Sequence, residues 1–325
     1  MSTESTGISR RSLLTGGAAA LAGGVLLGAA PAGAQTAAAA AGGRFNLSVG
    51  AEQWLREVAI KDETVLQSFA FDDAHSRVYL VQRQNGTDEL VGDMTLTQLS
   101  YSGVVTGYMV LNGFGHGVAI GVEPVGSDAY LWTETDANPG SGYGRAIARF
   151  RFSNGVSLTP TSSAVQVFRP VSGSTSNTLS IDTLNGRIGV RYRTSAGMGY
   201  RVYDLAAFKA GAFTPLHSFA QTGVDGETFQ GWALYGDYVY QMTGTAYTSE
   251  SGANPPSGHG NTYVTCLDVR TGALVQRSRT EAAYSLGYRE PEGMAVQRTS
   301  PPRLMLGFAS GATGARKVSL YYKQQ

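Results

Sequence analysis

Five polar residues recur at one position of a repeated sequence pattern. Each begins a short apolar segment, and the five are Gln67, His116, Asn177, Gln230 and Glu292. If the repeats adopt equivalent structures, these side chains converge on one point. Amides, carboxyls and an imidazole near its titration range suit binding or acid–base chemistry. The alternative is a plug of side chains that only satisfy one another, because buried polar groups must be paired.

His116 has the best-defined chemical role among them. It stands between Gly115 and Gly117, which leave room for a ligand beside the imidazole. His259 has the same flanking residues on a long loop rich in glycine, proline and serine. The loop is long enough to reach over the same region as His116, and the alternative is that His259 is only exposed to solvent, as a histidine in such a loop more often is.

Charged and aromatic side chains complete the candidate site. Strand alternation directs Glu134, Arg191 and Arg193 toward the same face from the ends of two expected strands. Neighbouring loops contribute Tyr143, Arg145 and Tyr247. Aromatic rings offer flat apolar faces to sugars, and arginine grips a carboxylate or phosphate through two parallel hydrogen bonds. The set predicts a sugar-binding site, with cross-strand charge pairing as the alternative role of the arginines.

The same residues allow two kinds of catalysis. In a lyase, His116 or a loop tyrosine would remove the proton beside a uronate whose carboxylate Arg193 neutralises. In a hydrolase, Glu292 and Glu134 would form the acid–base pair. The sequence shows no complete set of catalytic residues, so binding is favoured and the question of enzymatic activity stays open.

The elements that position these residues repeat with a period of about 56 residues. Five segments resemble one another, and each continues as apolar strands separated by turns at Asp, Gly or Asn. Four strands per repeat in a radial array predict an all-β, five-bladed β-propeller over residues 44–325. We expect an amino-terminal strand at residues 45–49 to complete the last blade. A β-sandwich is the alternative, but it does not explain the period.

Composition agrees with this architecture and excludes several classes of protein. Glycine accounts for 43 of 325 residues and charged residues for 15%, the balance of a turn-rich β protein. The net charge of +1 does not favour nucleic acid, and the single cysteine, Cys266, cannot form an intramolecular disulfide. No cofactor or metal motif is recognised. A closed ring leaves no free sheet edge, so we expect a monomer.

The amino terminus predicts export. Ser9-Arg10-Arg11-Ser12-Leu13-Leu14 precedes an apolar run and an Ala32-Gly33-Ala34 cleavage site. Residues 1–34 are therefore expected to be a twin-arginine signal peptide, and residues 35–43 an Ala/Gly-rich leader. The alternative, a membrane-anchoring helix, is disfavoured because the run is too short and too rich in glycine and alanine to span about 30 Å of hydrocarbon. We expect a protein secreted through the twin-arginine pathway, extracellular or associated with the cell wall, and free of the membrane after cleavage.

Several stretches also resemble a known family. They are Phe114–Glu123, Tyr130–Glu134, Phe229–Gly231, Tyr238–Tyr240 and Glu290–Ala295. Together they look like the five-bladed propeller shared by staphylococcal phage receptor-binding proteins and proteins called teichoic acid biosynthesis protein C. The resemblance covers essentially all of residues 44–325 and implies a propeller that meets cell-wall glycans. A polysaccharide or cell-wall glycan, teichoic-acid-type or uronate-bearing, is therefore the expected partner.

Overall fold

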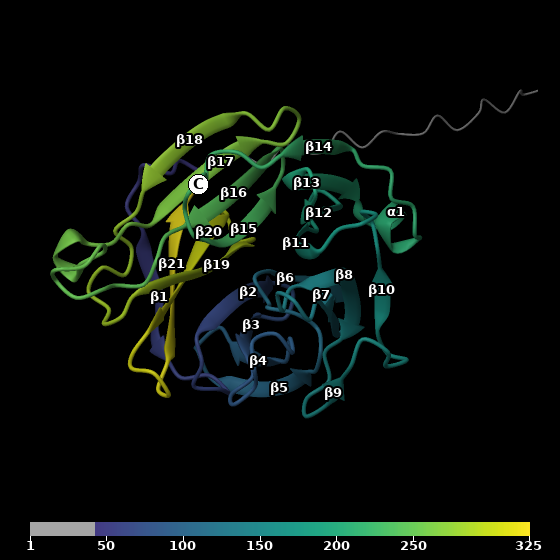
Figure 1. Ribbon diagram of the computed structural model, residues 1–325, viewed down its shortest axis with the longest axis horizontal. Coiled ribbons are helices and arrows are strands. Elements are labelled where there is room, and N and C mark those ends of the chain that lie inside the picture. Colours follow the sequence, from purple (N-terminus) through teal and green to yellow (C-terminus); the bar gives the residue numbers. More distant parts are fainter. Residues whose placement is uncertain (1–42) are drawn as a thin grey trace, which may run out of the picture. The chain divides into compact units, whose positions relative to one another are not determined.

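The strands form five sheets, which we number as blades 1 to 5 in the order of their innermost strands (Figure 1). The computed structural model describes residues 43–325. The predicted signal peptide and nearly all of the leader lie outside the described residues.

Each blade has four antiparallel strands in sequential order from the centre outward, except where β1 and β10 supply the outer strand and β9 adds a fifth. Blade 1 contains β2 (Leu66–Asp72), β3 (Arg77–Arg83), β4 (Met94–Ser100), β5 (Val105–Leu111) and β9 (Ser157–Leu158). Blade 2 contains β6 (Ile120–Val125), β7 (Asp128–Ala137), β8 (Gly144–Arg151) and β10 (Gln166–Phe168). Blade 3 contains β11 (Ser176–Asp182), β12 (Arg187–Thr194), β13 (Gly197–Asp204) and β14 (His217–Ala220). Blade 4 contains β15 (Phe229–Tyr235), β16 (Tyr238–Thr243), β17 (Tyr263–Asp268) and β18 (Leu274–Arg279). Blade 5 contains β19 (Glu290–Gln297), β20 (Arg303–Ser310), β21 (Lys317–Gln324) and β1 (Glu52–Val58).

The innermost strands close a ring. Contacts join β2 to β6, β6 to β11, β11 to β15, β15 to β19 and β19 back to β2. Every residue of β2 is buried, whereas the outer strand β18 is exposed or half-buried throughout. A strand packed between neighbouring blades buries both faces, which explains the apolar runs of the repeat. The predicted five-bladed β-propeller is confirmed.

An amino-terminal strand does complete the last blade, as predicted, but it is formed by other residues than expected. The strand that pairs with β21 is β1, with Leu55 opposite Leu320, and not residues 45–49. Phe45 is fully buried instead, its amide donating to Tyr240 Oη at 3.1 Å and its ring contacting Tyr235 and Tyr240. Phe45 and Leu47 pack instead into an apolar cluster formed by residues of blades 4 and 5.

Two short helical segments interrupt the strands. They are α1 (Leu205–Lys209), which Asp204 caps by accepting from the amide of Ala207, and a single 3-10 turn at Pro256–Gly258. No helix within residues 43–325 is long and apolar enough to cross a membrane. Cys266 is buried in β17, where burial raises the pKa of its thiol to about 12. Its position agrees with a packing role.

Candidate functional site

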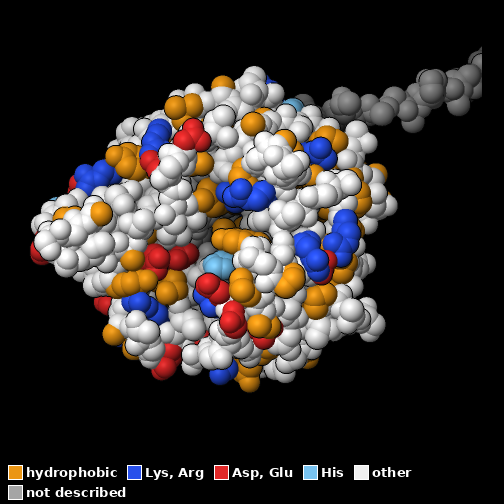
Figure 2. Space-filling model, in the orientation of Figure 1, with side chains coloured by type: hydrophobic (Ala, Val, Ile, Leu, Met, Phe, Trp, Pro, Cys, Tyr) orange, Lys and Arg blue, Asp and Glu red, His pale blue; other side chains and the backbone are white. Residues whose placement is uncertain are grey.

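Two adjoining cavities open at the face where the innermost strands begin. The first has a volume of about 610 Å³ and the second about 890 Å³. Their walls share Val118, Tyr143, Thr228 and Phe229. Figure 2 shows a hollow near the centre of the drawn face, with acidic, basic, apolar and histidine side chains around it. A much smaller cavity, of about 40 Å³, lies at the other ends of the innermost strands, and Arg298 forms part of its wall.

The first cavity brings together four of the five residues predicted at the repeated position. Gln67, His116, Gln230 and Glu292 all line it. The fifth, Asn177, is fully buried, with its Nδ2 donating to the carbonyl of Gly144 at 3.3 Å. Four of the five side chains at the repeated position therefore converge on one cavity, whereas the Asn177 side chain is buried within the protein.

The two glutamine amides are only partly used by the protein. Gln67 Nε2 donates to the carbonyl of Leu66 at 3.3 Å, and Gln230 Nε2 donates to that of Gly244 at 2.9 Å. Within residues 43–325, no hydrogen bond reaches the Oε1 atom of either side chain. Each amide therefore offers an acceptor to a ligand in the first cavity.

His116 stacks on Tyr143 across the wall between the cavities. Their ring centroids lie 4.9 Å apart and the planes differ by 22°. Burial lowers the pKa of His116 to about 4, and the nearby charge of Arg83 acts in the same direction. The imidazole is therefore neutral at pH 7, and the pair presents a flat aromatic face.

Glu134 lies behind this face and lines neither cavity, which corrects its expected place in the mouth. It is fully buried, and its carboxylate accepts the backbone N–H groups of Gly117 at 2.7 Å, Val118 at 3.3 Å and Gly144. Burial raises the pKa of Glu134 to about 7, outweighing these donors. The side chain holds the loops that carry His116 and Tyr143, so it positions the site without facing it.

The glycines beside His116 serve packing more than ligand access. Gly117 has φ of +83°, and a Cβ there would lie 2.6 Å from Val81 Cγ1. A Cβ on Gly115 would lie 2.5 Å from the carboxyl of Glu134. Only glycine allows the loop to approach Glu134 and blade 1 this closely.

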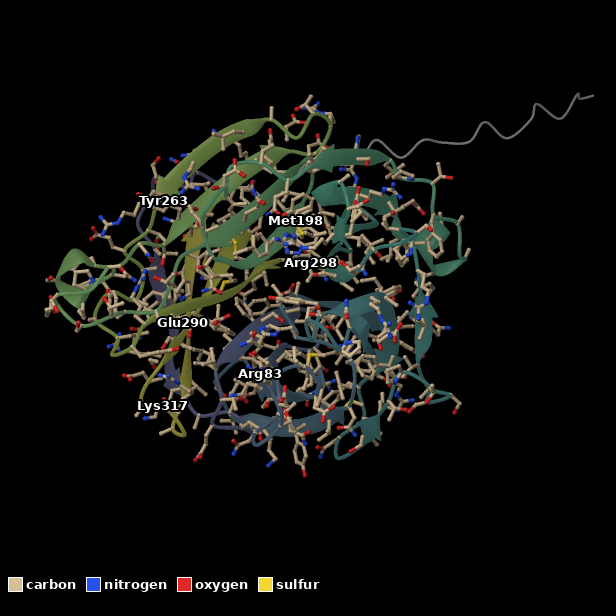
Figure 3. All side chains as sticks on the ribbon, viewed as in Figure 1. Arg83, Met198, Tyr263, Glu290, Arg298 and Lys317 are labelled. Carbon is tan, nitrogen blue, oxygen red and sulfur yellow. The ribbon has the colours of Figure 1, made fainter. Side chains whose placement is uncertain are left out.

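Glu292 is the buried carboxyl that does face the first cavity. It is 6% exposed, and no hydrogen bond from any residue of the described chain reaches its carboxyl. Burial raises its pKa well above the ordinary value, and the charge of Glu290 adds to the shift. Glu290 accepts a hydrogen bond from Tyr288 Oη at 2.5 Å. Glu290 and Arg83, both on the wall of this cavity, are labelled in Figure 3.

The second cavity is lined by two arginines from β12. Arg191 Nε and Nη2 donate to Gln221 Oε1 at 3.2 and 3.0 Å, and its guanidinium lies 3.7 Å from the ring centre of Phe229. Arg193 is exposed. Within residues 43–325 neither forms an ion pair, and their cross-strand neighbours are Thr178, Tyr200, Ser176 and Met198. Cross-strand charge pairing is therefore not the role of these arginines.

Three other predicted site residues line neither cavity. Arg145 forms an ion pair with Asp136 at 2.6 Å on the surface. Tyr247 is 9% exposed and donates from Oη to the carbonyl of Tyr284 at 2.9 Å. His259 Nδ1 lies 3.2 Å from a carboxyl oxygen of Glu281, and its ring contacts that of Tyr284 in a tilted arrangement. The 247–261 loop folds back on the segment before β19, because its polar groups find partners there.

Several cavity residues were not predicted. They are Arg83, Gln221, Thr228, Phe229, Tyr288, Glu290 and Arg316. Two carried a sequence signal: Phe229 directly precedes Gln230, and Glu290 lies two residues before Glu292, hence on the same side of a strand. Arg83 is the last residue of β3, and the others come from loops whose course the repeat does not specify. Among the described residues, no group of three or more His, Cys, Asp or Glu side chains is arranged to hold a metal ion.

Comparison with known proteins assigns the chain to a family. Residues 65–322 match the family described as the phage 5-bladed beta propeller receptor binding platform domain, and the chain belongs to that family. The five-bladed fold described above is thus the propeller of this family.

Two individual relatives agree with this assignment. A protein of Bacillus subtilis strain 168, provisionally named major teichoic acid biosynthesis protein C, is 27% identical over 280 residues, covering 82% of this chain and 60% of its own length. The tail fiber of Staphylococcus aureus phage P68 superposes with a TM-score of 0.63 at 18% identity, covering 82% of this chain and 53% of the fiber chain. The chain thus spans less than two thirds of either relative.

Proposed function

We propose that the protein binds a cell-wall glycan, of the teichoic-acid or uronate-bearing type, across the two cavities. The family is one of receptor-binding propellers, and the name of the Bacillus relative refers to a wall polymer. The observation that carries the proposal is the pair Arg191 and Arg193, which line a cavity without carboxylate partners among the described residues. An acidic group on a glycan would supply the missing charge.

The wall between the cavities suits the rest of such a ligand. Tyr143 and Phe229 contribute to both cavities and offer apolar faces to sugar rings. The stacking of Arg191 on Phe229 fixes the guanidinium plane, so less side-chain entropy is lost when it binds an anion. The free amide oxygens of Gln67 and Gln230 would accept hydroxyl groups on the other side.

Export through the twin-arginine pathway is part of the proposal, because a wall glycan is met outside the cytoplasm. It rests on the sequence of residues 1–34. We also propose that the protein acts as a monomer, since the ring closes on itself through β1 and β21.

The geometry favours binding over the two catalytic alternatives. For a lyase, His116 and Arg193 line different cavities, and burial raises the pKa of Tyr143, so its phenol stays protonated at neutral pH. For a hydrolase, Glu134 lies outside the cavity that contains Glu292. The pairing of Glu292 with Glu134 would require a ligand-driven rearrangement.

A binding assay on purified wall teichoic acid and a uronate polysaccharide tests the proposal. Replacing Arg191 and Arg193 together by methionine should abolish detectable binding, while the matched variant Arg145→Met should bind like the wild type. Binding that survives the double substitution would refute the proposed site. Mass spectrometry of the incubated glycans provides the second readout: unsaturated or water-added products would make the protein an enzyme.

A further inference from the structure

The first cavity contains a carboxyl group without a partner, whereas the second contains two arginines without carboxylate partners. Glu292 is nine-tenths buried, lines the cavity and receives no hydrogen bond from residues 43–325. Glu290, two residues earlier on β19, adds a second carboxyl to the same wall. A buried carboxyl without donors is costly when ionised, so its charged form needs a partner from outside the protein.

The other titratable or charged groups around this cavity do not supply that partner. They are Glu63, Arg83, His116, Tyr143, Tyr288 and Arg316. Arg83 pairs with Glu89 at 3.0 Å, and Arg316 donates to the carbonyl of Gly311 while its guanidinium lies 3.3 Å from the ring centre of Tyr288. His116 is neutral at pH 7. Neither Arg83 nor Arg316 forms an ion pair with Glu292, so the carboxyl of Glu292 is left unpaired among the described residues.

We propose that the first cavity receives a positively charged amino group of the ligand, with Glu292 as its principal acceptor and Glu290 and the free amide oxygens of Gln67 and Gln230 beside it. An ammonium has three donors and no acceptor, which matches a wall that offers carboxyl and amide oxygens. This inference rests on the proposed function, because it specifies the glycan further: the bound segment carries an amine in the first cavity and an acidic group in the second.

Ligand binding should then release a proton. Before binding, burial raises the pKa of Glu292 and so favours the protonated carboxyl. An approaching ammonium favours the carboxylate, so the proton leaves to buffer as the ion pair forms. Affinity for an amine-bearing ligand should rise with pH until the raised pKa of Glu292 is passed.

The experiment compares one wall glycan in two chemical states. Wall teichoic acid from Bacillus subtilis strain 168 is used as isolated and after acetic anhydride has capped its free amines, with amine content assayed before and after. Titration calorimetry in buffers of different ionisation enthalpy gives affinity and the protons released. We expect the full-length protein to bind the uncapped glycan about tenfold more tightly, with release of up to one proton for each bound ligand segment.

Glu292→Gln keeps the shape of the protonated side chain and should fold normally. It should bind both forms of the glycan alike and release no proton, whereas the control Glu281→Gln, which changes a carboxyl beside His259 and Arg279 outside both cavities, should behave as wild type. Equal binding of capped and uncapped glycan by the wild type would overturn the ammonium site and leave the proposed function standing. Failure to bind either form would instead refute the proposed function, and loss of the preference in EDTA would point to a metal cation.

Discussion

Blades 2 and 5 each contribute a buried glutamate near the mouth of the propeller, and the two side chains have opposite surroundings. Glu134 of β7 accepts three backbone N–H groups and faces no cavity. Glu292 of β19 receives no hydrogen bond from the described residues and faces the first cavity. In both, burial raises the carboxyl pKa.

The difference shows how equal burial can serve two purposes. A carboxylate saturated with donors holds the backbone and has little left to offer a ligand. A buried carboxyl that receives no hydrogen bonds contributes little to the stability of the folded protein, and its oxygens remain free to accept hydrogen bonds from a ligand. The number of hydrogen bonds, more than the pKa, separates a positioning residue from a binding one here.

The largest effect is expected from Glu134→Ala. Three backbone donors would lose their buried acceptor, and we expect a loss of about 3 kcal/mol in the free energy of unfolding. Urea unfolding measures it, and the stacking of His116 on Tyr143 should loosen at the same time. Unchanged stability would mean that water or another group satisfies these donors equally well.

Substitution of Arg191 should have the next largest effect, on binding. Arg191→Ala should weaken glycan binding about tenfold, because a charged hydrogen-bond donor and its stacking on Phe229 are lost. Arg191→Lys keeps the charge without the planar fork and should give an intermediate affinity. A lysine variant that binds as well as wild type would show that only charge matters at this position.

The pH dependence of stability should separate Glu292 from the rest of the chain. The pKa of Glu292 is raised in the folded protein, so the folded state binds the proton of this carboxyl more tightly than the unfolded state does. The contribution of Glu292 to the free energy of unfolding therefore falls as the pH rises above the ordinary glutamate pKa. Glu292→Gln should therefore match the stability of the wild type at pH 4 and exceed it at pH 8. Unfolding curves at the two pH values test this, and a variant less stable than wild type at pH 8 would contradict it.

The smallest effect is expected outside the cavities. His259 is engaged with Glu281 and Tyr284, and its loop folds away from the mouth. His259→Ala should change glycan affinity less than twofold in the same titration. A larger loss would place the ligand over the 247–261 loop and extend the site beyond the two cavities.

The sequence predicts the blades better than the wall of the site, and the reason is physical. A period of apolar strands determines which residues begin the innermost strands, so the convergence of Gln67, His116, Gln230 and Glu292 could be predicted. Whether a polar side chain at such a position turns inward depends on local hydrogen bonds. Asn177 finds the carbonyl of Gly144, and that preference is not visible in the repeat.

Loops and strand ends limited the other predictions. Glu134 was expected in the mouth because strand alternation gives a direction, but the donors on the neighbouring loops draw it behind the wall. Arg145 and Tyr247 were expected there as well, yet each finds a nearby partner elsewhere. Partners of this kind are set by the packing of the folded chain, which one sequence does not reveal.

The central claim is that ligand is bound where the two cavities meet. It is tested most directly by comparing two matched double variants in one titration with wall teichoic acid. Tyr143→Ala with Arg191→Ala removes one ring from the shared wall and one guanidinium from the second cavity. His259→Ala with Arg145→Ala removes the same kinds of group elsewhere. The account predicts at least a tenfold loss of affinity for the first pair and none for the second. Equal losses, or a loss only for the second pair, would contradict it.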